Sequence, residues 1–195
     1  MYSELLLLVG ISFSMGFTPG PNNAVASYSA FNFGVRKTLP IILGVTFGYT
    51  VLVILLILVL ISFFQKYPYL QEIIRILGSI FLIYLAYKIS FSKNKSKLKK
   101  ENPVKFYETF FFQFINPKGV MAAITLISKF VSQENYFSSS IMVIIVCSVT
   151  AFLSITSWAL LGKFLRKFAT NNEFIKRFNY AMSFLLVACV VSFYL

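Results

Sequence analysis

Two residue types that carry much enzyme and metal chemistry are missing from this sequence of 195 residues, which has no histidine and no aspartate. Its six acidic residues are all glutamates, and it has two cysteines. These absences exclude a His-based metal site and a Ser-His-Asp triad. Cys147 and Cys189 lie inside apolar runs, where cysteine packs as a small hydrophobic residue. We therefore expect no disulfide, no metal site and no cofactor.

Charged residues are also scarce, at 12% of the chain against 58% hydrophobic residues, whereas a soluble domain is about 25% charged. So few charges cannot cover a surface that faces water, so most of the surface must face lipid. The net charge of +12 does not indicate nucleic-acid binding. The lysines and arginines stand in short blocks between long apolar runs, as the positive-inside rule describes. We expect the lipid bilayer as a partner and no nucleic acid.

Six segments are long and apolar enough to cross a bilayer, which takes roughly 20 residues. They cover residues 5–33, 38–64, 69–91, 106–132, 137–162 and 178–195, and the last is short. A signal peptide would begin with a basic region, but the only early charge is Glu4, so the first segment is predicted to be a retained helix. The fold class predicted is an all-α integral membrane protein with six transmembrane helices.

The connections between these segments predict the orientation in the membrane. The first, third and fifth connections hold 14 of the 18 basic residues, which places them in the cytoplasm and both termini outside. The chain then divides into a first three-helix repeat at 1–92, a basic cytoplasmic linker at 93–105 and a second repeat at 106–195. Because three is odd, the second half enters from the opposite side, as in the inverted repeats of secondary transporters.

The first and fourth segments are both interrupted by proline. In the first, Pro19 and Pro21 flank Gly20, and neither proline can donate a backbone hydrogen bond. Such a cluster should unwind the helix, which then restarts with Pro21 in its first turn. The N–H groups of Asn22, Asn23 and Ala24 are predicted to point back toward the break and form an anion site.

The second interruption is Asn116-Pro117-Lys118, in which Asn116 suits the N-cap and Pro117 the first helical position. Lys118 would then lie in the first turn, where the helix dipole and the bilayer both disfavour a cation. An anionic group at this helix end would lower both costs. The alternative is that both interruptions are packing kinks, since proline and glycine are common in membrane helices.

The two interruptions lie at similar depths from opposite faces of the membrane. Thr18 is 14 residues from Glu4 and Asn116 is 11 from Lys105, or roughly 21 and 16 Å along a helix. Both positions are near the middle of a hydrocarbon core of roughly 30 Å. We expect them to form one site for a carboxylate, with these candidate substrate-binding residues: Thr18, Pro19, Gly20, Pro21, Asn22, Asn23, Asn116, Pro117 and Lys118.

Three further residues are candidates for lining a cavity or moving a proton. Glu108, near the inner end of the fourth helix, is either a proton or substrate group or an interfacial residue. Tyr49 and Gln113 are candidates for lining the cavity. Gly44 and Gly48 form a small-residue motif, which indicates close helix contact.

At these residues the sequence resembles the lysine-exporter (LysE/RhtB) family of amino-acid translocators. The resemblance covers most of residues 5–130, and beyond 135 only hydropathy agrees. It is carried by residues 16–22, by Gly34 before Arg36 and Lys37, by Gly44 with Gly48 and Tyr49, by Leu77-Gly78 before Tyr-Leu-Ala-Tyr at 84–87, and by Phe-Ile-Asn-Pro-Lys at 114–118.

The resemblance implies a multi-pass protein of the bacterial inner membrane that exports amino acids or small amino-acid-like metabolites, driven by the proton-motive force. The spans of this chain hold almost no acidic residues, which argues against a basic amino acid as substrate. The alternative is a membrane-embedded enzyme that acts on a lipid or anionic head group, although no nucleophile–base pair is evident. A structural membrane subunit would give no reason for Lys118. A homo-oligomer is left open.

Overall fold

The computed structural model describes residues 2–60, 67, 69–90, 104–132, 134–169 and 171–194, and every regular element in these residues is helical. The elements are α1 (Tyr2–Phe17), α2 (Pro21–Phe33), α3 (Val35–Leu55), the π-helical turn η1 (Leu56–Leu60), α5 (Tyr69–Ser90), α6 (Phe106–Ile115), α7 (Pro117–Phe130), α8 (Tyr136–Arg166) and α9 (Asn172–Ser192).

These helices make up to six membrane spans. Four are long apolar helices, namely α3 with η1, α5, α8 and α9. Two more are bent pairs, in which the chain bends by 57° between α1 and α2 and by 60° between α6 and α7. The predicted all-α membrane fold, with its first and fourth helices broken, is therefore confirmed. The inverted relation between the halves and the boundaries 1–92, 93–105 and 106–195 stay predictions, and residues 93–103 lie outside the described residues.

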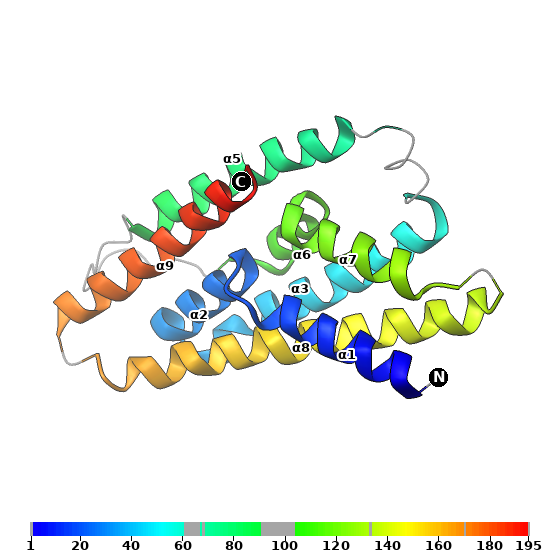
Figure 1. Ribbon diagram of the computed structural model, residues 1–195. Coiled ribbons are helices and arrows are strands. Elements are labelled where there is room, and N and C mark those ends of the chain that lie inside the picture. Colours follow the sequence, from blue (N-terminus) through cyan, green and yellow to red (C-terminus); the bar gives the residue numbers. More distant parts are fainter. Residues whose placement is uncertain are drawn as a thin grey trace.

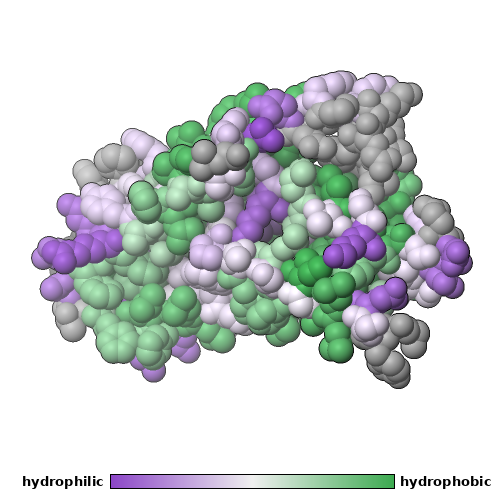
Figure 2. Space-filling view, viewed as in Figure 1, coloured by the Kyte–Doolittle hydropathy of each residue, from purple (hydrophilic) through white to green (hydrophobic). Residues whose placement is uncertain are grey.

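The surface is that of a protein surrounded by lipid. Large apolar side chains point outward along the spans, for example Phe137 at 78% exposure and Phe184 at 74%. Figure 2 shows hydrophobic residues over much of one face, with hydrophilic residues gathered toward its two ends and in a hollow near its middle. Such a surface could not be left in water, so the bilayer supplies the missing cover.

Two predicted helix boundaries are wrong because polar residues extend helices beyond their apolar segments. The sixth helix, predicted at 178–195, begins at Asn172, since the side chain of Asn171 accepts a hydrogen bond from the Phe174 N–H and Glu173 pairs with Arg177 one turn later. The fifth helix continues to Arg166, where basic residues suit the C-terminal end of a helix.

The first connection is also shorter than predicted. The second helix, expected from 38, begins at Val35, so Arg36 and Lys37 lie in its first turn rather than in a loop. The whole connection from α2 to α3 is Gly34, whose φ of 85° is one that side chains rarely adopt. A glycine at this position therefore allows the chain to reverse within one residue.

The described interior holds two large apolar clusters and a smaller one around Phe31, and the broken helices contribute to all three. The larger joins α2, α3, α5, α6, α8 and α9, and the second joins α1, α3, η1, α7 and α8. Figure 1 shows α5 and α9 together along one side and α8 along the other, with α2, α6 and α7 between them and α1 crossing α8 in this view. The long helix α8 packs against α1, α2, α3 and α7. Gly20, Asn116 and Pro117 of the breaks are therefore buried in protein, whereas Thr18 and Pro19 are exposed.

Glycines let the helices around the breaks approach closely. A Cβ at Gly44 would overlap the Phe106 carbonyl oxygen and Thr109 Oγ1, and one at Gly48 would lie 2.6 Å from the Phe110 carbonyl oxygen. The predicted close-contact motif thus holds α3 against α6, the first half of the second broken helix.

The substitution Gly44→Ala tests this contact. The added methyl group must displace helix backbone, so we expect a loss of about 1–3 kcal/mol of stability and a lower melting temperature in detergent. Gly10→Ala is the matched control, because nothing lies within 4 Å of its added Cβ, and alanine favours a helix over glycine. Equal melting temperatures for the two variants would contradict the close α3–α6 contact.

Candidate functional site

The first break lies between Phe17, the last residue of α1, and Pro21, the first residue of α2. The break and the restart of the helix at Pro21 were both predicted from Pro19 and Pro21. The carbonyls that lose their helical donors are instead served by side chains. Asn23 Nδ2 and Ser154 Oγ donate to the Gly16 carbonyl at 2.9 and 2.7 Å, and Trp158 Nε1 donates to the Phe17 carbonyl at 3.3 Å. Unwound backbone at membrane depth needs such partners.

Asn23 holds the break together from the first turn of α2. Its side-chain amide donates to the Gly16 and Thr18 carbonyls, and its Oδ1 accepts from Ser154 Oγ at 3.3 Å. The predicted row of free N–H groups is partly wrong, because the N–H of Ala24 donates to the Gly20 carbonyl at 2.9 Å. That bond is the first of the restarted helix, so α2 leaves fewer free donors than expected.

The second break is a single extended residue, Asn116, between Ile115 at the end of α6 and Pro117 at the start of α7. Asn116 has the N-cap position that was predicted, but its side chain makes no capping hydrogen bond. Its Oδ1 is buried without a hydrogen-bond partner, in a residue only 2% exposed. A buried acceptor without a donor is costly, so this atom is a candidate ligand contact.

Lys118 joins the two breaks. Its Nζ donates to the Thr18 carbonyl at 2.9 Å, to Thr18 Oγ1 at 2.9 Å and to the Pro19 carbonyl at 3.0 Å. The two costs predicted for this cation are therefore offset in part without a bound anion. The ammonium lies beyond the C-terminal end of α1, where a helix dipole stabilises positive charge, and its three donors meet three acceptors.

A cavity of about 80 Å³, here called the central cavity, lies between the two breaks. Its volume is several times the roughly 10–15 Å³ needed by one water molecule, so it has room for several water molecules. Six of the nine predicted site residues line it together with Tyr49, namely Gly20, Pro21, Asn22, Asn23, Asn116 and Lys118. The two breaks, nearly 100 residues apart in sequence, thus line one cavity.

A larger space of about 550 Å³, here called the cleft, lies on the other side of Lys118. The remaining three predicted residues, Thr18, Pro19 and Pro117, line the cleft rather than the central cavity. Lys118 lines both spaces. The lysine and the carbonyls that it binds therefore stand between the two.

The three further candidates have different positions. Tyr49 lines the central cavity as predicted. Gln113 is fully buried and pairs with Asn22 through two amide hydrogen bonds of 2.8 and 3.2 Å, so it positions a cavity residue without lining the cavity itself. The prediction that Glu108 belongs to the cavity is wrong. It lies in the first turn of α6, accepts a hydrogen bond from the Lys105 N–H at 2.6 Å and lines neither space.

Sequence reasoning missed the residues that α5 and α8 contribute. Ser154 and Trp158 serve the carbonyls of the first break, and Arg75 lines the cleft. The only tryptophan of the chain, in the middle of an apolar helix, was a signal, because a buried indole N–H needs an acceptor. Ser154 gave no signal, since serine is common at contacts between membrane helices.

The central cavity offers amide groups and one ammonium, and no acidic residue lines it within the described part of the chain. Lys118 and the free N–H groups of α2 suit a carboxylate, and Asn116 Oδ1 suits a donor such as an ammonium. Donors from both breaks, together with an acceptor from the second break, suit a small molecule that carries both charges.

Comparison with known proteins gives one consistent answer. The family model described as LysE type translocator matches residues 13–195. Relatives from Escherichia coli strain K12 and Shigella flexneri, each named a cysteine/O-acetylserine efflux protein, are 27% identical over 175 residues, which is 89% of this chain and 89% of theirs. No solved structure gives a significant match.

Asn23→Ala tests how the first break is held. The change removes three side-chain hydrogen bonds, and we expect a loss of about 1–2 kcal/mol of stability. Faster amide hydrogen exchange at residues 16–20 should accompany it. Asn32→Ala is the control at the other end of α2, where the side chain bonds Tyr28 and Asn179 instead, and should leave exchange at 16–20 unchanged. Equal exchange in both variants would show that Asn23 does not hold the break.

Proposed function

The chain belongs to the LysE type translocator family, and on that premise we propose that it exports small neutral amino acids or closely related metabolites across a bacterial inner membrane. Membership makes it a membrane transporter, so the alternative of a membrane-embedded enzyme is set aside. The observation that carries the proposal is the meeting of the two broken helices at Lys118 and the central cavity.

The substrate carboxylate binds at Lys118 and at the N–H groups that begin α2, near Asn22 and Asn23. Both are donors of the kind that favours an anion. The substrate ammonium donates to Asn116 Oδ1, which is buried and otherwise lacks a partner. Gly20 keeps the approach open, because a Cβ there would lie 2.7 Å from Lys118 Nζ. The other three candidate substrate-binding residues, Thr18, Pro19 and Pro117, contact the substrate from the cleft.

Two observations support a small neutral substrate. The central cavity is small, at about 80 Å³. No acidic side chain lines it in the described residues to compensate a basic side chain. The relatives are named for the efflux of cysteine and O-acetylserine, which are small and carry no net side-chain charge. These names support the same class of substrate for this chain.

Lys118 is also suited to act as a gate. Its ammonium has three donors, and all three are used by Thr18 and Pro19. A substrate carboxylate must compete with these acceptors, so binding would loosen the contact that separates the central cavity from the cleft. A ligand shifts a conformational equilibrium through such a difference in contacts. Family precedent leads us to include coupling to the proton-motive force, which counterflow with and without a pH gradient would test.

Lys118→Gln tests carboxylate binding in counterflow assays with proteoliposomes. Loss of a charge-assisted hydrogen bond should weaken amino-acid binding by about one to two decades. The amide of the same amino acid, such as serinamide beside serine, lacks the carboxylate. We therefore expect it to be a poor substrate of the wild type and to be affected little by the substitution.

Thr18→Val is the matched control for a purely structural role of Lys118, because it removes one of the three acceptors and keeps the lysine. If Lys118 binds the carboxylate, this variant should keep the preference for serine over serinamide. If Lys118 only joins the two breaks, both variants should lower transport of serine and serinamide in the same proportion. The second result would contradict the carboxylate site.

The proposed orientation has both termini outside and the 93–105 linker in the cytoplasm. Lys97→Cys in a background without Cys147 and Cys189 tests it. We expect no labelling of intact cells by an impermeant thiol reagent and ready labelling of inverted vesicles. Labelling of intact cells at this position would reverse the orientation and leave the transport proposal untouched.

A further inference from the structure

The cleft contains a second cation that the central site does not use. Its described lining includes Arg75 of α5 together with Lys118, and no acidic residue is among that lining. The remaining polar lining is formed by hydroxyl groups of Ser14, Thr18, Thr125 and Ser192. A space that opens from Lys118 toward Arg75 is therefore positive and rich in hydrogen-bonding groups, which suits the passage of an anionic group.

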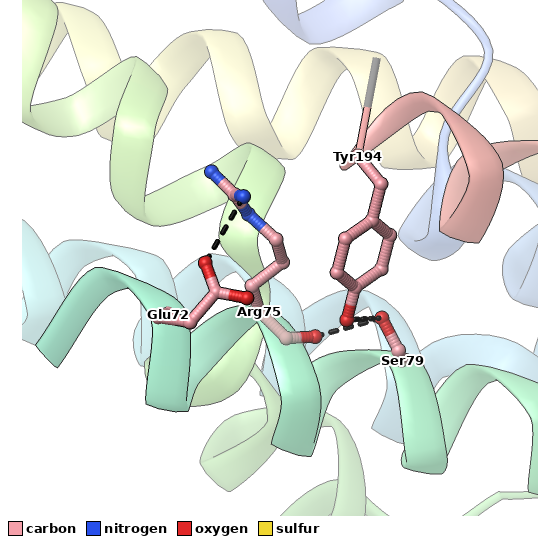
Figure 3. Close-up of polar contacts among 4 residues, drawn as sticks. All are labelled: Glu72, Arg75, Ser79 and Tyr194. Atoms are coloured by element: carbon pink, nitrogen blue, oxygen red, sulfur yellow. Dashed lines mark hydrogen bonds and ion pairs between the residues drawn. The ribbon is translucent and has the colours of Figure 1, made fainter. Parts of the chain in front are cut away.

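The Arg75 side chain has two neighbours, Glu72 and Tyr194, and Ser79 links Tyr194 to the backbone of α5. Arg75 Nη1 lies 3.1 Å from Glu72 Oε2, and its guanidinium carbon lies 5.6 Å from the centre of the Tyr194 ring. Ser79 bonds the Arg75 carbonyl at 2.7 Å and the Tyr194 hydroxyl at 3.3 Å. Figure 3 shows the Glu72 and Arg75 side chains rising from α5 beside Tyr194, which comes from the end of α9. This arrangement fixes the guanidinium without enclosing it.

The exposure of the ion pair leaves Arg75 able to bind something more. Its side chain is 37% exposed and that of Glu72 is 52% exposed, so neither is sequestered. Glu72 does not line the cleft, whereas Arg75 does. An arginine offers five donors in a planar fork, and one contact with Glu72 leaves others available for a second carboxylate.

From this geometry we infer that Arg75, positioned by Glu72 and Tyr194, is a second carboxylate-binding residue in the cleft, which receives the substrate carboxylate between the central cavity and the external solution. The inference rests on the proposed function. In the proposed orientation α5 begins outside, so Arg75, in its second turn, lies on the external side of Lys118. Two cations in sequence along one path attract a carboxylate and repel a cationic side chain.

This arrangement defines the class of molecule that can leave by the cleft. Amino acids with neutral or acidic side chains can pass with their carboxylate leading. Lysine-like substrates bring an extra positive charge to a lining that already holds Lys118 and Arg75 without an acidic partner. Like charges brought close together repel one another. Selection against cations is therefore a property of the cleft as well as of the central cavity.

Arg75→Gln and Glu72→Gln together test the inference in counterflow with labelled serine, because both break the same ion pair. If Arg75 binds the carboxylate, Arg75→Gln should raise the half-saturation concentration about fivefold, a modest value because the contact is partly exposed. Glu72→Gln should instead lower it about twofold, since it removes the competing carboxylate. The double variant should behave as Arg75→Gln does. Relative uptake of lysine should rise in Arg75→Gln alone and in the double variant.

A structural role for the ion pair predicts the opposite pattern. In that case Glu72→Gln and Arg75→Gln would impair serine counterflow alike and lower the melting temperature alike, which would overturn the inference. Arg75→Lys keeps the charge without the planar fork and should lie between wild type and Arg75→Gln. Normal counterflow in Arg75→Gln, with a defect in Lys118→Gln, would overturn the role of Arg75 and leave the proposed function standing. No counterflow of any amino acid by the wild type would instead refute the proposed function.

Discussion

The hydrogen bonds from Lys118 to the carbonyls of Thr18 and Pro19 are the contact on which the centre of this molecule depends. A lysine at the start of a helix in a membrane is unfavourable by itself. Unwound backbone in a membrane is unfavourable as well, because its carbonyls lack donors. Each defect supplies what the other lacks, so the two broken helices are stable together in a way that neither would be alone.

The packing of the surrounding helices follows from the need to supply donors to the unwound backbone. The break of the first helix still has carbonyls that Lys118 cannot reach, and α8 provides Ser154 and Trp158 for them. For these donors to reach the break, α8 must pack closely along α2. Gly162 permits this, because a Cβ there would overlap the Ser27 backbone. The close packing of α8 is thus the means by which the polar break is kept from lipid.

The sequence was informative wherever a residue acts on its own backbone. Pro19, Pro21 and Pro117 lack an N–H whatever surrounds them, so both breaks could be predicted, and so could the six spans. The sequence was misleading where a side chain had more than one available hydrogen-bond partner. Asn116 suited a helix cap but leaves its Oδ1 without a partner, and Glu108 turned to the Lys105 N–H rather than to a cavity. The choice depends on neighbours such as α8, whose position hydropathy does not specify.

The helix boundaries failed for a related reason. Hydropathy reports where lipid can lie, whereas a helix continues until its hydrogen bonds end, so the capped and ion-paired start of α9 lay outside the apolar segment. The same distinction applies to the site. Lys118 looked like an uncompensated charge when only its depth was considered, yet its three donors are all used. Because those acceptors belong to a break that is already unwound, they can be exchanged for a carboxylate without melting a helix. Under the proposed function, a lysine whose donors already have partners would bind a carboxylate less tightly than an unpaired lysine, because the carboxylate must compete with those partners, and weaker binding favours release.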